Sequence, residues 1–280
     1  MGVTTDPVRA TTWWGRLWFA PAAVAIVLIR LRFFFTPITT DEGGFLAIGR
    51  WWGHGARLYR DIFVDRPQGL LLVFRVLAAV GLDRPNGVRL VALAFCLVGS
   101  AACGSIAGRV LGVRAALMSA LAVGVLTSIP RLEGFTANGE LLSGAAGALS
   151  LAVLLRAVWQ RQSPSLPWLA VSGLLAGVAV SIKQSGFDAV GAGIIILVVT
   201  LVRDPWPARR KRLAPIVFVA GAVLPVLLMV LHGAVTGWHD WWDEVVRYRS
   251  SQRSIVKGAE WRSLFGTGRT ALPLLAAGVV

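Results

Sequence analysis

A succession of long apolar runs most constrains how this 280-residue chain can fold. Hydrophobic residues make up 56% of the sequence, and several runs approach the roughly 20 residues that a helix needs to cross a bilayer. We therefore expect an all-α polytopic membrane protein with about seven or eight transmembrane helices. These helices are expected near residues 17–36, 88–108, 113–129, 140–158, 166–183, 187–202 and 213–235, with a last one from 271. Because the last run stops at residue 280, we expect a C-terminally truncated fragment of a longer protein.

The formal net charge of +14 fits membrane topology better than nucleic-acid binding, because the basic residues gather in short segments between apolar runs. The apolar segment 69–82 carries Arg75 and is too short to cross easily, so we expect a juxtamembrane helix there. The basic loops then fall on one side, together with a cytoplasmic N-terminus at 1–16. The rest, 17–280, forms one membrane domain whose outer loop is 37–68.

The two cysteines, Cys96 and Cys103, are expected on one helix about 10 Å apart, too far for a disulfide. At the other end of the chain, Trp238, Trp241 and Trp242 recur at helical spacing among charged residues. This pattern is typical of a helix in the membrane interface.

The outer loop carries the residues that most suggest chemistry. Asp41 and Glu42 follow the first expected helix by about four residues, and a carboxylate at the rim of an apolar wall can act as a general base on a hydroxyl. We expect Arg30 and Arg32, near the end of that helix, to form structural pairs with these acids.

The order of elements in this loop resembles a known enzyme family. The acidic pair is followed by Leu58-Tyr59-Arg60-Asp61, then by Arg66-Pro67-Gln68, and then by the short helix. This order is similar to that of polyprenyl-phosphate-sugar-dependent membrane glycosyltransferases, the protein O-mannosyltransferase and aminoarabinose transferase superfamily with its C-type fold. The chain departs from that pattern at Gln68, where a second proline is usual, and at Arg66, where Lys or His is frequent.

The resemblance implies transfer of a sugar from a polyprenyl-phosphate donor to a hydroxyl of an extracytoplasmic glycan, lipid or protein, with inversion. Asp41 matches the catalytic base, with Glu42 beside it as a helper or a metal-facing acid. Negative charge builds on the departing phosphate, so a cation is needed there. Arg66 is the first candidate and Lys183, at the end of a small-residue helix, is the second.

The turn 130–144 is expected on the same side as the loop and supplies further candidates for substrate binding, Glu140 and Arg131, in addition to Tyr59. The three histidines lack the spacing of metal ligands, so no metal or other cofactor is assigned, although Asp41 and Glu42 leave a divalent cation open.

Two other functions stay open. A transporter or lipid flippase would also need many small-residue helices, but such proteins usually keep ionisable sites near the bilayer midplane and repeated halves, which this sequence lacks. A purely structural membrane subunit would leave the acidic loop without a role.

Overall fold

The fold was obtained as a computed structural model, which describes residues 18–130, 133–159 and 163–248. These residues are helical apart from turns and one isolated bridge. The helices are α1 (Ala20–Leu31), α2 (Thr40–Gly53), α3 (Gln68–Ala79), α4 (Pro85–Leu111), α5 (Val113–Leu126), α6 (Gly139–Val158), α7 (Leu166–Ile182), η3 (Gln184–Gly186), α8 (Phe187–Arg203), α9 (Ala208–Trp242) and η4 (Asp243–Arg247). The expectation of an all-α membrane protein is confirmed.

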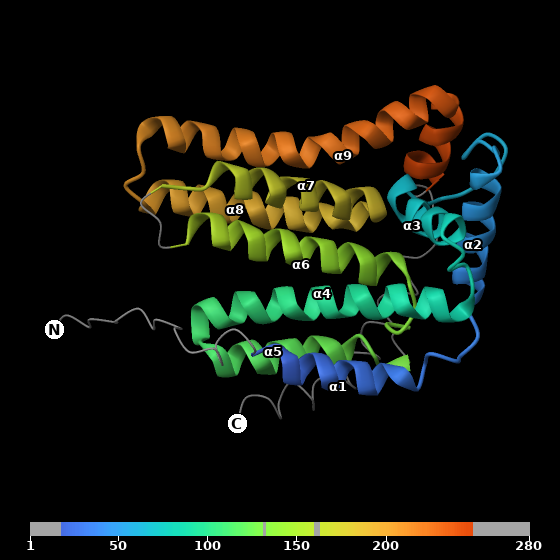
Figure 1. The fold of residues 1–280 in the computed structure, drawn as a ribbon. Helices are drawn as coiled ribbons and strands as arrows, with labels where there is room; N and C mark the ends of the chain where they lie inside the picture. The colour runs from blue at the N-terminus through green and yellow to red at the C-terminus, as the bar shows by residue number, and fades with distance from the viewer. Residues whose placement is uncertain (1–17, 131–132, 160–162, 249–280) are drawn as a thin grey trace, which may run out of the picture. The chain divides into compact units, whose positions relative to one another are not determined.

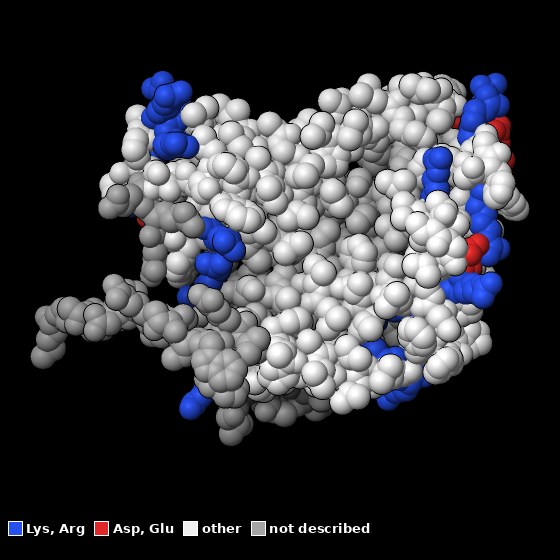
Figure 2. All heavy atoms as spheres, viewed as in Figure 1, with Lys and Arg blue, Asp and Glu red and all other residues white. Residues whose placement is uncertain are grey.

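Four of the described helices are long and apolar enough to cross a bilayer: α4, α6, the run Gln184–Arg203 and the run Ala208–Arg247. The shorter apolar helices α1, α3, α5 and α7 lie beside them in the sequence (Figure 1). Figure 2 shows how charged residues are distributed on one face of the protein. Lys, Arg, Asp and Glu gather toward the ends of the helices, and a broad band of uncharged side chains lies between them. Such a band is what a lipid environment requires.

The first and the seventh of the expected helices differ most from their expected bounds. The first is shorter than the expected 17–36, because the chain leaves α1 through tight turns in which Phe33 and Thr36 donate to carbonyls three residues back, and Pro37 follows. The helix expected at 213–235 begins earlier, at Ala208, and a kink at Gly237, with φ +147°, separates it from the expected tryptophan-rich helix that follows. The helix expected from 271 lies outside the described residues.

The chain divides into two compact units. The first contains residues 1–56 and 67–231, and the second contains 57–66 and 232–280. In the described part of the second unit, the backbone N–H of Val64 donates to the Glu244 carboxylate at 2.7 Å, and the rings of Phe63 and Tyr248 meet edge to face.

Within the first unit, α6 packs against α4 on one side and against α7 and α8 on the other (Figure 1). The sequence of α6 is rich in Gly, Ala and Ser, and small residues let helix backbones approach closely where lipid replaces water. Hydroxyl groups then bond across the contact: Ser150 Oγ donates to Ser172 O at 2.7 Å, and Ser172 Oγ donates to Ser150 O at 2.8 Å.

Glycine is required where α7 meets α9. A Cβ at Gly173 would lie 2.0 Å from the carbonyl oxygen of Phe218, which is backbone and cannot move aside cheaply. By contrast, a Cβ at Gly144 on α6 would meet no atom within 4 Å.

We predict that Gly173→Ala lowers the free energy of unfolding by about 1–3 kcal/mol, the usual cost of overpacking. Gly144→Ala is the matched control and should leave stability unchanged or slightly higher, because alanine favours helix. Thermal unfolding of the detergent-solubilised protein measures both. An equal loss in the two variants would contradict the packing described for α7 and α9.

Candidate active site

The predicted acidic pair lies in the first turn of α2, whose start is set by a capping box. The sequence Thr39-Thr40-Asp41-Glu42 places a glutamate three residues after the capping threonine. The Thr39 hydroxyl accepts from the N–H of Glu42 at 3.4 Å, and the N–H of Thr39 donates to Glu42 Oε2 at 2.8 Å. Adjacent acids at this position also suit the positive end of the helix dipole.

Glu42 is buried and paired. Its Oε1 accepts from Arg89 Nη1 at 2.5 Å and from the N–H of Ala137 at 2.8 Å, and the two paired side chains are 1% and 3% exposed. With the Thr39 N–H and hydroxyl on Oε2, four donors fill the roughly four acceptor positions of a carboxylate. Glu42 thereby joins α2, α4 and the turn before α6.

Arg89 was not identified in the sequence, although it is essential to this arrangement. Its other nitrogens donate to Pro37 O at 2.6 Å and to Thr36 Oγ1 at 3.3 Å, and its guanidinium lies 5.1 Å from the ring centroid of Phe135. Its position could have drawn attention to it, because Arg89 lies in the first turns of an apolar helix, where a charge is costly unless it has a partner.

Asp41 is exposed at the rim of this buried pair. Among the described residues, no ion pair involves its carboxylate. The oxygen atoms of Asp41 are thus accessible to a substrate, while the neighbouring Glu42 fixes the backbone that carries them.

The expected pairing of Arg30 and Arg32 with the acids is wrong. Arg30 Nη2 instead donates to two backbone carbonyls, Thr127 O at 2.6 Å and Gly134 O at 2.8 Å. Thr127 caps the end of α5, where helix carbonyls lack partners in the helix. The Arg32 guanidinium lies 4.5 Å from the ring centroid of Phe33.

Lys183 and Glu140 form an ion pair between Nζ and Oε1. Glu140 lies in the first turn of α6, which Asn138 caps by accepting from the N–H of Leu141 at 2.8 Å. Lys183 ends α7. Because Ala137 binds Glu42 and Glu140 binds Lys183, one short turn connects the start of α2 with the end of α7. Three of the predicted segments therefore meet at one end of the first unit.

Tyr59 and Arg66 belong to the second unit. The Tyr59 hydroxyl donates to Arg66 O at 3.0 Å, and Arg66 Nη1 pairs with Asp65 at 2.7 Å. Tyr59 has a φ of +72°, and burial, reinforced by the nearby Glu244 carboxylate, raises the pKa of its phenol well above its ordinary value. The phenol thus stays protonated and able to donate.

Arg131, a predicted substrate-binding residue, lies outside the described residues. Within the described ranges, no group of three or more His, Cys, Asp or Glu side chains is arranged to hold a metal ion.

The buried pair can be tested by a double-mutant cycle. We predict that Glu42→Gln and Arg89→Met each lower the free energy of unfolding by about 3–5 kcal/mol, because each leaves one buried charge without its partner. The double variant should lose clearly less than the sum of the two. Denaturant unfolding in detergent measures all three.

The control is the exposed Arg50–Asp83 pair, whose side chains are 52% and 23% exposed. Arg50→Met should cost at most about 1 kcal/mol. Additive losses from Glu42→Gln and Arg89→Met would show that the two groups do not act as a pair.

A comparison with known protein families gave a match. Residues 65–231 match the family described as dolichyl-phosphate-mannose-protein mannosyltransferase, which is more than half of the chain. The matched region includes Arg89, Glu140 and Lys183, whereas Asp41 and Glu42 precede it. No curated protein and no solved structure matched the chain.

Proposed function

The chain belongs to the dolichyl-phosphate-mannose-protein mannosyltransferase family, and from this premise we propose that it moves a sugar from a polyprenyl-phosphate donor to an acceptor hydroxyl outside the cytoplasm. Membership makes it a membrane glycosyltransferase of the mannosyltransferase type. The donor, the inverting mechanism and the residue roles are our proposal. The observation that carries it is the meeting of the Asp41 turn, the start of α6 and Lys183 at one end of the first unit.

In the proposed reaction, Asp41 removes the proton from the acceptor hydroxyl. The acceptor oxygen attacks the anomeric carbon of the sugar from the face opposite the phosphate. The bond between that carbon and the phosphate oxygen breaks, and the polyprenyl phosphate leaves with the bonding electrons. The carboxylate of Asp41 suits the role of base because it is exposed and because none of the ion pairs among the described residues includes it.

Lys183 is the proposed cation for the departing phosphate. Its ammonium is held near the start of α6 by Glu140, and its side chain is 26% exposed. A fixed positive charge beside a leaving group stabilises charge that develops in the transition state. Glu42, with its acceptor positions filled by protein donors, is assigned to positioning of Asp41.

Arg66, Tyr59 and Arg131 are retained as substrate-binding candidates from the sequence, with Arg66 facing the donor phosphate. Arg66 and Tyr59 are linked to each other through the hydrogen bond at the Arg66 carbonyl, so a change at one is expected to affect the other.

The proposed orientation puts the Asp41 end outside and the N-terminus in the cytoplasm. In its support, α4, α6 and α8 each end in a turn that carries an arginine: Arg109, Arg156 and Arg203. The first turns of α4 and α6 lie at the Asp41 end, and α8 begins four residues after Lys183. Short basic segments favour the cytoplasmic side.

We predict that Asp41→Asn lowers sugar transfer by at least about a hundredfold, because the amide cannot accept the hydroxyl proton. Transfer of labelled mannose from polyprenyl-phosphate mannose by membranes containing the protein measures this. Asp83→Asn is the control. Asp83 is also an aspartate outside the apolar helices, and it forms a surface ion pair with Arg50.

Two results would contradict this assignment. Full transfer by Asp41→Asn would remove Asp41 as the base. If the unaltered protein moved the lipid across vesicle membranes and transferred no sugar, the alternative function of a lipid flippase would be favoured instead.

A second prediction concerns Lys183. We expect Lys183→Met to lower transfer by about 10²–10³-fold, the usual loss when one group that stabilises developing negative charge is removed. Lys183→Arg should recover part of the activity because it restores the charge. Equal activity in the Met and Arg variants would show that the charge at this position does not act on the phosphate.

A further inference from the structure

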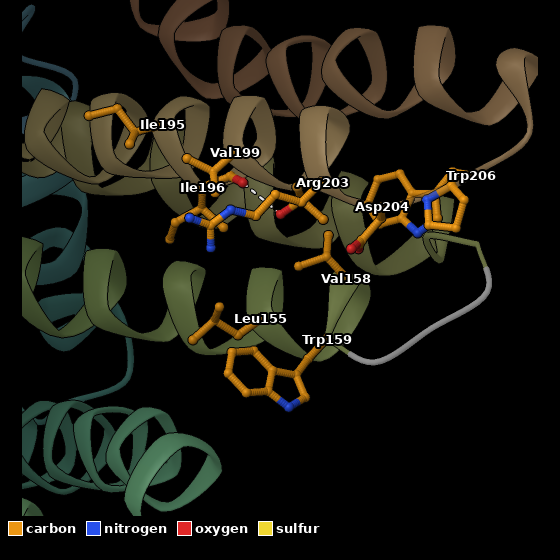
Figure 3. Close-up of a pocket in the computed structure, with 11 residues that line it drawn as sticks. Leu155, Val158, Trp159, Ile195, Ile196, Val199, Arg203, Asp204 and Trp206 are labelled. Atoms are coloured by element: carbon orange, nitrogen blue, oxygen red, sulfur yellow. Dashed lines mark hydrogen bonds between the residues drawn. The ribbon is translucent and has the colours of Figure 1, made fainter. Parts of the chain in front are cut away.

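A large cavity lies far from the candidate active site, between the C-terminal halves of α6 and α8 (Figure 3). Its volume is about 570 Å³, within the range of ligand pockets. Apolar side chains line most of it, including Leu155, Val158, Ile195 and Val199. Glu140 begins α6 while the cavity lies near its end, so the two sites are roughly 25 Å apart along this helix.

Among the described residues that line this cavity, Arg203 is the one Lys or Arg. In Figure 3 its side chain runs back along α8, so that its guanidinium lies near Ile196. Across the described ranges, no carboxylate pairs with Arg203. Arg203 is exposed, so its guanidinium is accessible to a ligand and can bind two phosphate oxygens at once.

Residues typical of a membrane interface lie at this end of α6 and α8. Trp159 lines the cavity and is 37% exposed, and Trp is enriched at the headgroup level, whereas Trp206 is buried. The basic run 209–212 opens α9 just beyond, and Lys211 Nζ donates to Leu201 O at 2.9 Å, which ties this run to the end of α8. Nearby on α6, the Arg156 guanidinium lies 4.6 Å from the ring centroid of Trp168.

We propose that this cavity binds an acyl chain of an anionic glycerophospholipid whose phosphate is held by Arg203. The apolar wall accommodates the chain, and the surrounding basic residues complement a negatively charged headgroup. Basic pockets between membrane helices bind anionic lipids in this way. The site stands on its position at the membrane interface and is independent of the proposed sugar transfer.

The test compares two lipids with identical acyl chains, phosphatidylglycerol and phosphatidylcholine. Each is added to the purified full chain in detergent, and bound lipid is counted by native mass spectrometry. We expect several-fold more phosphatidylglycerol to be retained. Arg203→Gln should lower that retention about tenfold, and Val199→Trp, which fills the cavity without changing charge, should lower it as well.

Arg209→Gln is the matched control, because Arg209 is exposed, carries the same charge and does not line the cavity. It should retain phosphatidylglycerol like the unaltered protein. Equal retention of the two lipids, equal losses from Arg203→Gln and Arg209→Gln, or preferential retention of added polyprenyl phosphate would each overturn the proposal. If Arg203→Gln does not fold, the Val199→Trp comparison decides.

Discussion

The arrangement of the Asp41 end depends on one buried ion pair, Glu42 with Arg89. Removing two charges from water is costly, and a buried pair often adds little to net stability compared with an apolar replacement. The pair instead favours one arrangement of the segments around it, because each buried donor of Arg89 and each acceptor of Glu42 needs a partner in a fixed position. Here the partners come from α2, α4 and the turn before α6, so the pair determines how three separate segments meet.

Most of the helices could be predicted from sequence because the length of an apolar run is a local property. The bounds of α6 and α7 agree with the expected 140–158 and 166–183 to within one residue. The same holds near the end of α9, where the kink at the non-helical Gly237 separates the apolar stretch from the tryptophan-rich stretch. The start of α9 at Ala208 was not predicted, because its first turn is basic and lies outside the apolar run.

The site was only partly predictable. Glu140 and Lys183 were both identified, but not as a pair, because 43 residues separate them and periodicity carries no information about distant contacts. Arg30 shows the opposite error. Opposite charges suggested a carboxylate partner, whereas the free carbonyls after α5 were nearer and equally in need of a donor. The family match supports the enzyme class, but the base at Asp41 precedes the matched region and stays a prediction.

The pairing of Lys183 with Glu140 bears on how such an enzyme completes its cycle. In the proposed reaction, Glu140 places the ammonium before the donor arrives, and the donor phosphate would then share or replace that carboxylate contact. Under that proposal, the carboxylate would return to the ammonium as the spent lipid departs. Such competition would weaken retention of the product and free the site for the next donor.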